Sequence, residues 1–308
     1  MKKRTPGIGL HSSRDTGRFL QALHVEGALL ANNHVTDFDI PISEQKRYLA
    51  SYGIQSCGAA DTLPEAEKPC FFEHRGRKVG ILAFGWETIS CIAATEDSKG
   101  VNPLRYDHIF DSVRNFQKLH PGTPLVTIFH WNYEYELYPQ PAHRKLAFEL
   151  IDLGVTAVYG HHPHIAGGAE IYRGKPVFYS LGNFYFPAGI YSGFRVEPPK
   201  EAYRGLCVEY ADDAQETMLY WTRLHPDGKL TVESSEKMVR SERLALLSPF
   251  AGMSHEKYIG WFRKNRRKKK LLPIYKNPQS RLETRFNDLW VDTRQRAIDF
   301  LVRLRSKH

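Results

Sequence analysis

The sequence predicts an α/β protein in which strands and helices alternate over the first two thirds of the chain, with antiparallel strands after them. Short apolar, β-branched runs alternate with segments whose apolar residues recur every three to four positions. Three of these runs also end in Asn/His clusters, at residues 32–34, 130–131 and 160–164. In α/β sheets, sites form in the crevice at the carboxyl ends of the strands, so the three endings predict one functional site.

The first predicted elements are short. In order, they are a helix over residues 15–25, a strand over 28–31, a helix over 42–52, and two strands over 70–73 and 78–84. Asp15 stands at the start of the first helix as its predicted cap, and Gly53 follows the second helix, a position that often takes glycine. Residues 75–77, Arg-Gly-Arg, predict a hairpin turn between the two strands.

The later elements continue the alternation. In order, they are a helix over residues 106–120, a strand over 125–129, a helix over 141–153, strands over 156–159 and 176–181, and an antiparallel meander over 206–234. The helix over 141–153 has the clearest limits, because Pro141 stands in its first turn and Gly154 follows its end. Four of its apolar residues share one face, which predicts that it packs on the sheet: Leu146, Ala147, Leu150 and Ile151.

Positive charge is concentrated at the carboxyl end of the chain. Residues 255–308 contain 16 Lys and Arg against 5 Asp and Glu, whereas residues 1–254 contain 27 against 29. The change predicts a body over residues 1–250 and a basic linker with an amphipathic helix over residues 251–308. The helix is expected over 281–305, where apolar residues have helical spacing: Leu282, Phe286, Leu289, Trp290, Ala297, Leu301 and Leu304.

The composition excludes several classes of protein. With 42% apolar and 25% charged residues, the chain is unlike disordered, collagen-like or coiled-coil proteins. No apolar run approaches the roughly 20 residues that cross a bilayer, and the basic start lacks an apolar signal region. The sequence as written therefore predicts a soluble chain, with attachment to a membrane surface as an alternative, and leaves its localisation open. The four cysteines form no C-x-x-C pair, which argues against a zinc knuckle or a disulfide scaffold.

The histidines at the strand ends suit a metal site. In an extended loop, His162 and His164 would project from the same side of the chain, and His130 adds a third imidazole. With an oxygen from Asn33, they give three nitrogen ligands and one oxygen, a set suited to Zn, Mn or Fe. His34 is placed for general acid catalysis, because imidazole titrates near neutral pH. The alternative is a set of unrelated surface or helix-capping histidines.

Four segments match one known family in order and spacing. Residues 31–37 read ANNHVTD, residues 130–135 HWNYEY, residues 160–164 GHHPH and residues 179–184 YSLGNF. The first two resemble the motifs A-N-N-H-x-x-D and H-W-G-x-E-Y of the capsule-synthesis CapA (poly-γ-glutamate synthesis) family, and the later two are also similar to it. The resemblance covers about residues 15–210 of the chain.

The resemblance carries expectations about fold and chemistry. The CapA family is similar to the calcineurin-like metallophosphoesterases, which implies an α/β sandwich of mixed sheets flanked by helices, with a dimetal site. It implies His34 as proton donor or transition-state stabiliser, Glu134 as a carboxylate that faces the substrate or supports the ligands, and Asn183 as a loop-organising residue. A water activated by two metals would attack phosphorus or an amide carbonyl. The implied ligands of one or two divalent ions (Mn, Zn or Fe) are Asn33, His130, His162 and His164.

The chain departs from the family pattern in two places. The family has a strand that ends in Gly-Asp and a later Asn-Leu-Glu, both ahead of residues 31–37, and neither occurs here. Those carboxylates would complete the metal site. Three explanations stay open: a sequence start that omits the first strand, a member that has lost its chemistry, or a partner that supplies the missing part. At Asn132 the family usually has glycine, and asparagine tolerates positive φ better than most residues.

Two functional hypotheses follow. The first is a metal-dependent hydrolase of capsule, poly-γ-glutamate or other anionic exopolymer biosynthesis, acting on the polymer or on a phosphorylated intermediate. The second is a catalytically degenerate scaffold of the same fold, which binds polymer, a synthase or a membrane surface through its basic tail. Retention of all the histidines favours the first, and the missing carboxylate motifs favour the second.

The basic tail has its own alternatives. Residues 263–270 carry seven positive charges in eight residues and follow several aromatic side chains. Residues 257–272 could therefore contact an anionic membrane surface or an anionic polymer. They could equally form a solvated linker before a helix that packs on the body. Nucleic acid ranks last as a partner, because no nucleic-acid-binding fold is visible.

Overall fold

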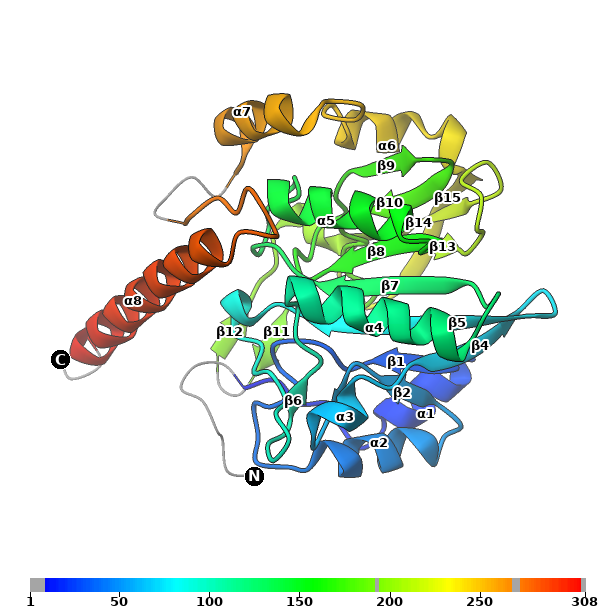
Figure 1. Cartoon of the computed structure of the whole chain (residues 1–308). Coiled ribbons are helices and arrows are strands. Elements are labelled where there is room, and N and C mark those ends of the chain that lie inside the picture. Colours follow the sequence, from blue (N-terminus) through cyan, green and yellow to red (C-terminus); the bar gives the residue numbers. More distant parts are fainter. Residues whose placement is uncertain (1–8, 192–193, 268–271, 306–308) are drawn as a thin grey trace.

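The computed structural model describes residues 9–191, 194–267 and 272–305 of the chain. A six-stranded mixed sheet with strand order β4-β5-β7-β8-β10-β9 lies at its centre (Figure 1). Strands β5, β7, β8 and β10 are parallel, whereas β4 and β9 pair antiparallel at the two edges. The carboxyl ends of the four parallel strands therefore meet at one edge. The strands are β4 (Cys70–His74), β5 (Arg77–Gly85), β7 (Leu125–His130), β8 (Ala157–His161), β9 (Ala169–Tyr172) and β10 (Lys175–Phe178).

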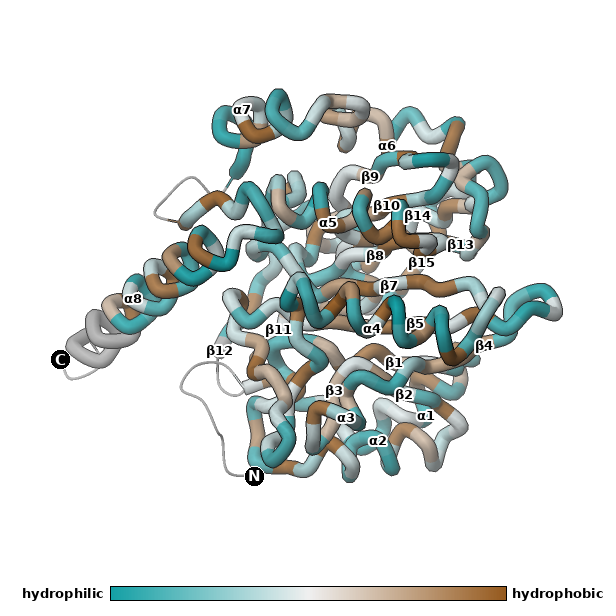
Figure 2. Tube along the Cα trace, in the orientation of Figure 1, coloured by the Kyte–Doolittle hydropathy of each residue, from teal (hydrophilic) through white to brown (hydrophobic). Residues whose placement is uncertain are grey.

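Both faces of this sheet are covered. Helices α4 (Tyr106–Leu119) and α5 (Pro141–Asp152) pack on one face, where Leu125 and Phe129 of β7 join their core. A second core lies on the other face, where Val126 of β7 packs with residues of β13 and β14. Because successive residues of a strand point to opposite faces, β7 has to be apolar nearly throughout, and Figure 2 shows it largely brown. The predicted α/β sandwich of mixed sheets is confirmed.

The remaining elements form smaller layers around the sheet. Strands β1 and β2 pair in parallel, β3 with β6 and β11 with β12 antiparallel, and β13, β14 and β15 form the predicted meander. Among the described residues, no helix has the length and apolar content needed to cross a membrane. The elements are α1 (Thr16–Ala22), β1 (Gly27–Leu29), α2 (Ile42–Ala50), β2 (Gln55–Cys57), β3 (Ala59–Ala60), α3 (Leu63–Ala66), η1 (Glu87–Ile89), β6 (Gly100–Val101), β11 (Gly189–Tyr191), β12 (Phe194–Val196), η2 (Lys200–Tyr203), β13 (Arg204–Glu209), β14 (Met218–Leu224), β15 (Leu230–Lys237), η3 (Met238–Arg240), α6 (Glu242–Leu247), α7 (His255–Asn265) and α8 (Arg281–Arg305).

The predicted elements are present, with local differences. Asp15 occupies the predicted cap position of α1, and its side chain accepts no capping hydrogen bond there. Strand β9, which turns into β10 at Arg173 and Gly174, is not revealed by the sequence pattern because two of its four residues are not buried. Helix α8 has the predicted limits and projects from the body (Figure 1).

The first part of the basic extension belongs to the main core. Tyr258 and Phe262 of α7, and Tyr275 after it, are buried in the same cluster as α4 and α5. Helix α7 therefore lies on α5 with its aromatic face inward, while Arg263 and Lys264 stay exposed. Residues 268–271 of the predicted basic segment lie outside the described residues.

A buried ion pair within the body binds the start of the basic extension at residues 252 and 253. Arg144 of α5 donates to both oxygens of Glu170 on β9, from Nε at 2.6 Å and from Nη2 at 2.7 Å. Glu170 also accepts from Tyr179 Oη at 2.8 Å and from the Gly252 amide at 3.1 Å, and Arg144 donates to the Met253 carbonyl. All partners of both charges are thus supplied by the protein, which is the condition for a buried pair to be tolerated.

Removing one charge of this pair should destabilise the fold. We expect Glu170→Gln to lower the free energy of unfolding by about 3–5 kcal/mol, because Arg144 would remain buried without a counter-charge. The measurement is urea unfolding followed by circular dichroism. Glu65→Gln, at the exposed pair with Lys68, is the matched control and should change stability by less than about 1 kcal/mol. Equal effects of the two substitutions would contradict the assignment.

His143 of α5 is another ionisable side chain that is buried in the core. Its ring stacks on Trp131 with centroids 4.9 Å apart and meets the edge of Trp86 at 4.6 Å. No described residue hydrogen-bonds its buried Nδ1. Burial lowers the pKa of His143 from 6.5 to about 3, because a charged ring would lose its hydration among these aromatic groups. The folded protein therefore holds His143 neutral.

This histidine should make the fold acid-sensitive. Below pH 6.5 the unfolded chain takes up a proton at His143 and the folded chain does not, so its contribution to stability is lost as the pH falls toward 3. Between about pH 7 and pH 5, we expect this residue alone to reduce the free energy of unfolding by about 2 kcal/mol. The loss of unfolding free energy between about pH 7 and pH 5 should be smaller by that amount in His143→Gln than in the unmodified chain. An equal loss in the variant and the unmodified chain would refute the explanation.

Candidate metal centre

The strand register brings the predicted histidines together. Parallel pairing of β7 with β8 places His130 directly opposite His161. The loop after β1 reaches the same place, because Asn33 Oδ1 lies 2.9 Å from His130 Nε2. The ring of His162, just beyond β8, has its centroid 4.6 Å from that of His130. The convergence of the three predicted clusters at the carboxyl ends of the strands is confirmed.

Hydrogen bonding defines the tautomer of His130. Asn33 Oδ1 can only accept, so His130 Nε2 donates to it. In a neutral ring, Nδ1 then has the lone pair, and it accepts from Nδ1 of His161 at 2.8 Å. His161 is left with a buried Nε2 to which no described residue hydrogen-bonds. His161 is therefore the residue that orients His130, a role that the sequence alone did not indicate.

The loop of His162 and His164 is kinked, which corrects the expectation of an extended segment. Both residues have positive φ, at 97° and 63°, and their ring centroids lie 5.8 Å apart. Such φ values are strained for residues other than glycine and are typical of functional sites. His164 Nδ1 donates to Asn183 Oδ1 at 2.9 Å, and the Asn183 amide donates to the Ala202 carbonyl. Asn183 thus organises the loop, as the resemblance implied, and leaves Nε2 of His164 with its lone pair.

Burial keeps three of these imidazoles uncharged. Loss of hydration lowers the pKa of His130 and of His162 well below 6.5, and neighbouring histidines lower it further. The same burial lowers the pKa of His161 to about 4. Neutral imidazoles are the form that binds metal ions. At neutral pH, each of these three rings therefore keeps one nitrogen without a proton.

His34 lies at the exposed side of the cluster. Its Nδ1 is 2.8 Å from Asp37 Oδ2, and the same oxygen accepts from the Leu10 amide at 2.8 Å. Asp37 therefore fixes the orientation of the ring while a third of the His34 side chain stays accessible. Asp37 was visible in the sequence as the last residue of the A-N-N-H-x-x-D match. An accessible, oriented imidazole is suited to proton transfer.

The two acidic residues of the loop after β7 differ in their surroundings. Glu134, predicted to face the substrate or support the ligands, is exposed. Glu136 is 1% exposed, and its Oε1 accepts from the backbone amides of Leu137, Tyr138 and Arg267. Glu136 therefore ties the site loop to the end of α7. Nothing in its spacing distinguished it from Glu134 in the sequence.

A metal ion fits this donor set in part. Among the described residues, no group of three or more His, Cys, Asp or Glu is arranged to hold a metal. However, neighbouring donors about 2.1 Å from an octahedral ion are about 3.0 Å apart, close to the 2.9 Å between His130 Nε2 and Asn33 Oδ1, whereas those of a tetrahedral zinc ion are about 3.4 Å apart. His162 also has a buried Nδ1 without a described hydrogen-bond partner. Amide oxygen and imidazole nitrogen are ligands of Zn, Mn and Fe.

Two backbone positions shape the site. Gly160 of β8 lies so close to its neighbours that a Cβ there would be 2.2 Å from the Tyr179 carbonyl oxygen and 2.3 Å from Trp131 Nε1. Trp131 Nε1 donates to that carbonyl at 2.9 Å. Asn132 has φ of 68°, so the expected positive φ at this position is confirmed. Its amide donates to the Tyr138 carbonyl at 2.9 Å, which closes the loop.

Comparison with protein families identifies relatives of this chain. The family model described as bacterial capsule synthesis protein PGA_cap matches residues 2–188, more than half of the chain. The PGA biosynthesis protein CapA of Bacillus subtilis (strain 168) is 29% identical over 184 residues, which are 59% of this chain and 48% of that protein. A probable polyglutamine synthesis accessory protein of Mycobacterium tuberculosis (strain ATCC 25618 / H37Rv) is 31% identical over 191 residues, 58% of this chain and 50% of that one.

The chain spans about half the length of the curated relatives that it matches. Among solved structures, a 5′-nucleotidase precursor from Thermus thermophilus is similar over 80% of this chain and 46% of that chain. The TM-score of that match is 0.36 and the sequence identity is 15%.

Substitution of Gly160 should disturb the strand ends. We expect Gly160→Ala to lower the free energy of unfolding by about 1–3 kcal/mol, because the methyl group would displace the Tyr179 carbonyl and Trp131. Gly260→Ala in α7 is the matched control, since a Cβ there meets nothing within 4 Å. It should raise stability by about 0.5–1 kcal/mol through helix propensity. Thermal unfolding of both variants tests the pair, and a neutral Gly160→Ala would show that the approach is not tight.

Proposed function

This chain belongs to the bacterial capsule synthesis protein family PGA_cap, and on that premise we propose that it is a metal-dependent hydrolase of capsule or related anionic exopolymer synthesis. The names of its relatives in Bacillus subtilis and Mycobacterium tuberculosis support a role in making such a polymer. The observation that carries the hydrolase proposal is the buried, neutral histidine cluster against Asn33. Its substrate would be the polymer or a phosphorylated intermediate.

The chain's own residues prepare the site for a divalent ion. In the hydrogen-bonded arrangement Nε2 of His130 carries the proton, so to bind a metal that proton would move to Nδ1, which would then donate to Nδ1 of His161. In that tautomer Asn33 Oδ1 and Nε2 of His130 would be the first pair of ligands, with His162 and His164 completing the set. His161 and Asn183 orient His130 and His164 through their second ring nitrogens, as metal-binding histidines generally require. A bound divalent ion would act as a Lewis acid and lower the pKa of a water molecule.

His34 would supply the proton that the leaving group needs. Asp37 accepts from Nδ1, so Nε2, which has only a long 3.4 Å contact to Asn33 Nδ2, is the nitrogen that would turn to the substrate. When Nε2 carries a proton, transfer to the departing oxygen or nitrogen leaves His34 neutral and the leaving group uncharged. Glu134, exposed at the same loop as His130, is proposed to face the substrate.

A second function is supported by a separate observation. The described residues contain no ready group of three or more His, Cys, Asp or Glu for a metal ion. A scaffold that binds the polymer or a synthase without chemistry would have this property. Activity and binding have to be measured separately to distinguish the two.

Metal content is the decisive first measurement. We expect purified protein loaded with Mn or Zn to retain at least one equivalent by elemental mass spectrometry, and His162→Ala and His164→Ala to lose most of it. His225→Ala, outside the cluster, is the control and should bind as the unmodified chain does. No retained metal in the unmodified protein would refute the hydrolase and favour the scaffold, in which case His164→Ala should still bind poly-γ-glutamate.

The proton-donor role of His34 has a different signature. We expect His34→Ala to keep its metal and lose about 10²–10⁴-fold in kcat on an activated phosphodiester or on poly-γ-glutamate. Asp37→Asn should show a smaller loss, because the ring is still present but less well oriented. A His34→Ala variant that loses metal together with activity would instead make His34 a ligand.

A further inference from the structure

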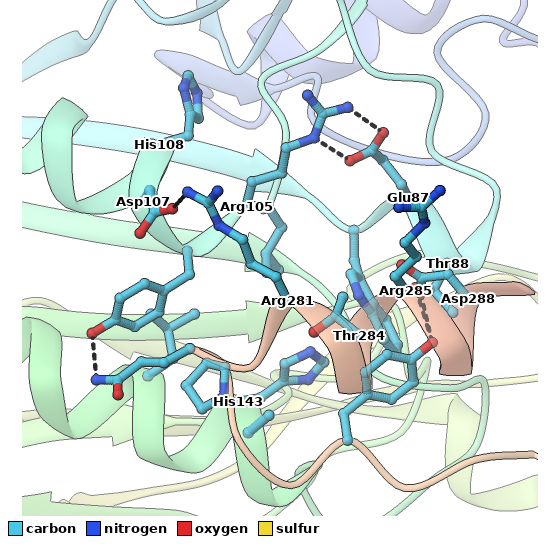
Figure 3. A pocket seen from close by; sticks show the side chains of 18 residues that line it. Glu87, Thr88, Arg105, Asp107, His108, His143, Arg281, Thr284, Arg285 and Asp288 are labelled. Carbon is cyan, nitrogen blue, oxygen red and sulfur yellow. Dashed lines mark hydrogen bonds and ion pairs between the residues drawn. The ribbon is translucent and has the colours of Figure 1, made fainter.

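Helix α8 is attached to the body through its polar side. Asp288 Oδ1 accepts from Thr88 and from Tyr275 Oη, both at 2.7 Å, and Asn287 donates to the Ile274 carbonyl. Arg281 pairs with Asp107 of α4. A cavity of about 520 Å³ lies between the first turns of α8 and the body. Figure 3 shows Thr88, Asp107, Arg281 and Asp288 around it. The contacts hold the helix in one orientation.

The opposite side of the same turns is apolar and exposed. Four large hydrophobic residues lie within nine positions at helical spacing, and they are 84%, 71%, 65% and 48% exposed: Leu282, Phe286, Leu289 and Trp290. We name these four residues the α8 stripe. Amphipathic helices of globular proteins normally turn such a face to the core, and here the polarity is reversed. A contiguous exposed patch of this kind marks an interaction surface.

Two arginines lie on one border of the α8 stripe. At about 3.6 residues per turn, Arg285 and Arg296 fall along that border together with Asp292, and all three are exposed. Arg263, Lys264 and Arg267 at the end of α7 are exposed as well. Residues 268–270, outside the described residues, add three lysines to this sequence segment. The partner that suits these features is negatively charged and also offers an apolar interior.

We propose that the α8 stripe inserts into the interface of an anionic lipid bilayer. A hydrophilic polyanion would satisfy the basic residues but would bury no Leu, Phe or Trp. A second copy of the chain would bury the stripe but would bring two strongly basic extensions together, with like charges opposed. An anionic bilayer satisfies both, since aromatic and aliphatic residues insert below headgroups that attract Lys and Arg. The proposal does not depend on metal binding or hydrolysis.

The test is co-sedimentation of the full chain with vesicles of phosphatidylcholine containing about 30% phosphatidylserine. We expect the double variant Phe286→Glu/Leu289→Glu to bind at least tenfold more weakly than the unmodified chain. Leu246→Glu on α6 is the matched control, because Leu246 is 81% exposed and lies outside the stripe. It should bind as the unmodified chain does. Vesicles of phosphatidylcholine alone should bind at least tenfold more weakly.

Fluorescence locates the inserted residue. Trp86, Trp131 and Trp221 are buried, and Trp261 is partly buried against the main core, whereas Trp290 is about half exposed. Vesicles should therefore shift the emission to shorter wavelength, and Trp290→Phe should remove most of that shift. Equal vesicle binding by the double variant and the unmodified chain would overturn the proposal. So would a dimer in analytical ultracentrifugation that the double variant abolishes without changing vesicle binding, or loss of poly-γ-glutamate binding in its place.

Discussion

The parallel pairing of β7 with β8 is the constraint on which the site depends. It sets His130 opposite His161, and β5 on the other side of β7 sets Gly85 opposite His130. Because side chains alternate along a strand, a shift of one residue would turn His130 to the other face and away from Asn33. The apolar residues of β7 divide between the two cores and fix this register. Packing of the sheet therefore positions a polar cluster.

Desolvation of that cluster has opposing effects on stability and chemistry. Burial of His130, His161 and His162 lowers their pKa values, so the folded state loses stability as the medium becomes acidic. The same burial keeps their lone pairs free of protons at neutral pH. Together with the positive φ of His162, it indicates a site held in a strained arrangement by the surrounding fold. A cluster with only a structural role would gain more from hydrogen bonds than from unpartnered nitrogens.

The sequence predicted most elements because their signals are local. Helix periodicity, Pro141 at the start of α5 and the Arg-Gly-Arg turn each act within a few residues, and so does the tolerance of Asn132 for positive φ. Tertiary partners were not predictable in this way. His161 orients His130 through the pairing of β7 with β8, and Glu136 accepts a hydrogen bond from the amide of Arg267, far along the chain. The positive φ of His162 and His164 was not predicted either.

Glu136 connects the loop of the histidine cluster to the basic extension. Its carboxylate holds the loop that carries Trp131 and Glu134, and it accepts the Arg267 amide at the end of α7. The basic segment therefore begins at a fixed place relative to the histidine cluster. Tyr275, whose hydroxyl donates to Asp288 of α8, lies in the main hydrophobic core together with residues of α4, α5 and α7. The hydrogen bonds of Glu136 and Tyr275 thus connect the strand ends to the basic residues after α7 and to the α8 stripe. An anionic surface that bound the stripe and these basic residues would consequently meet the histidine cluster in a defined orientation.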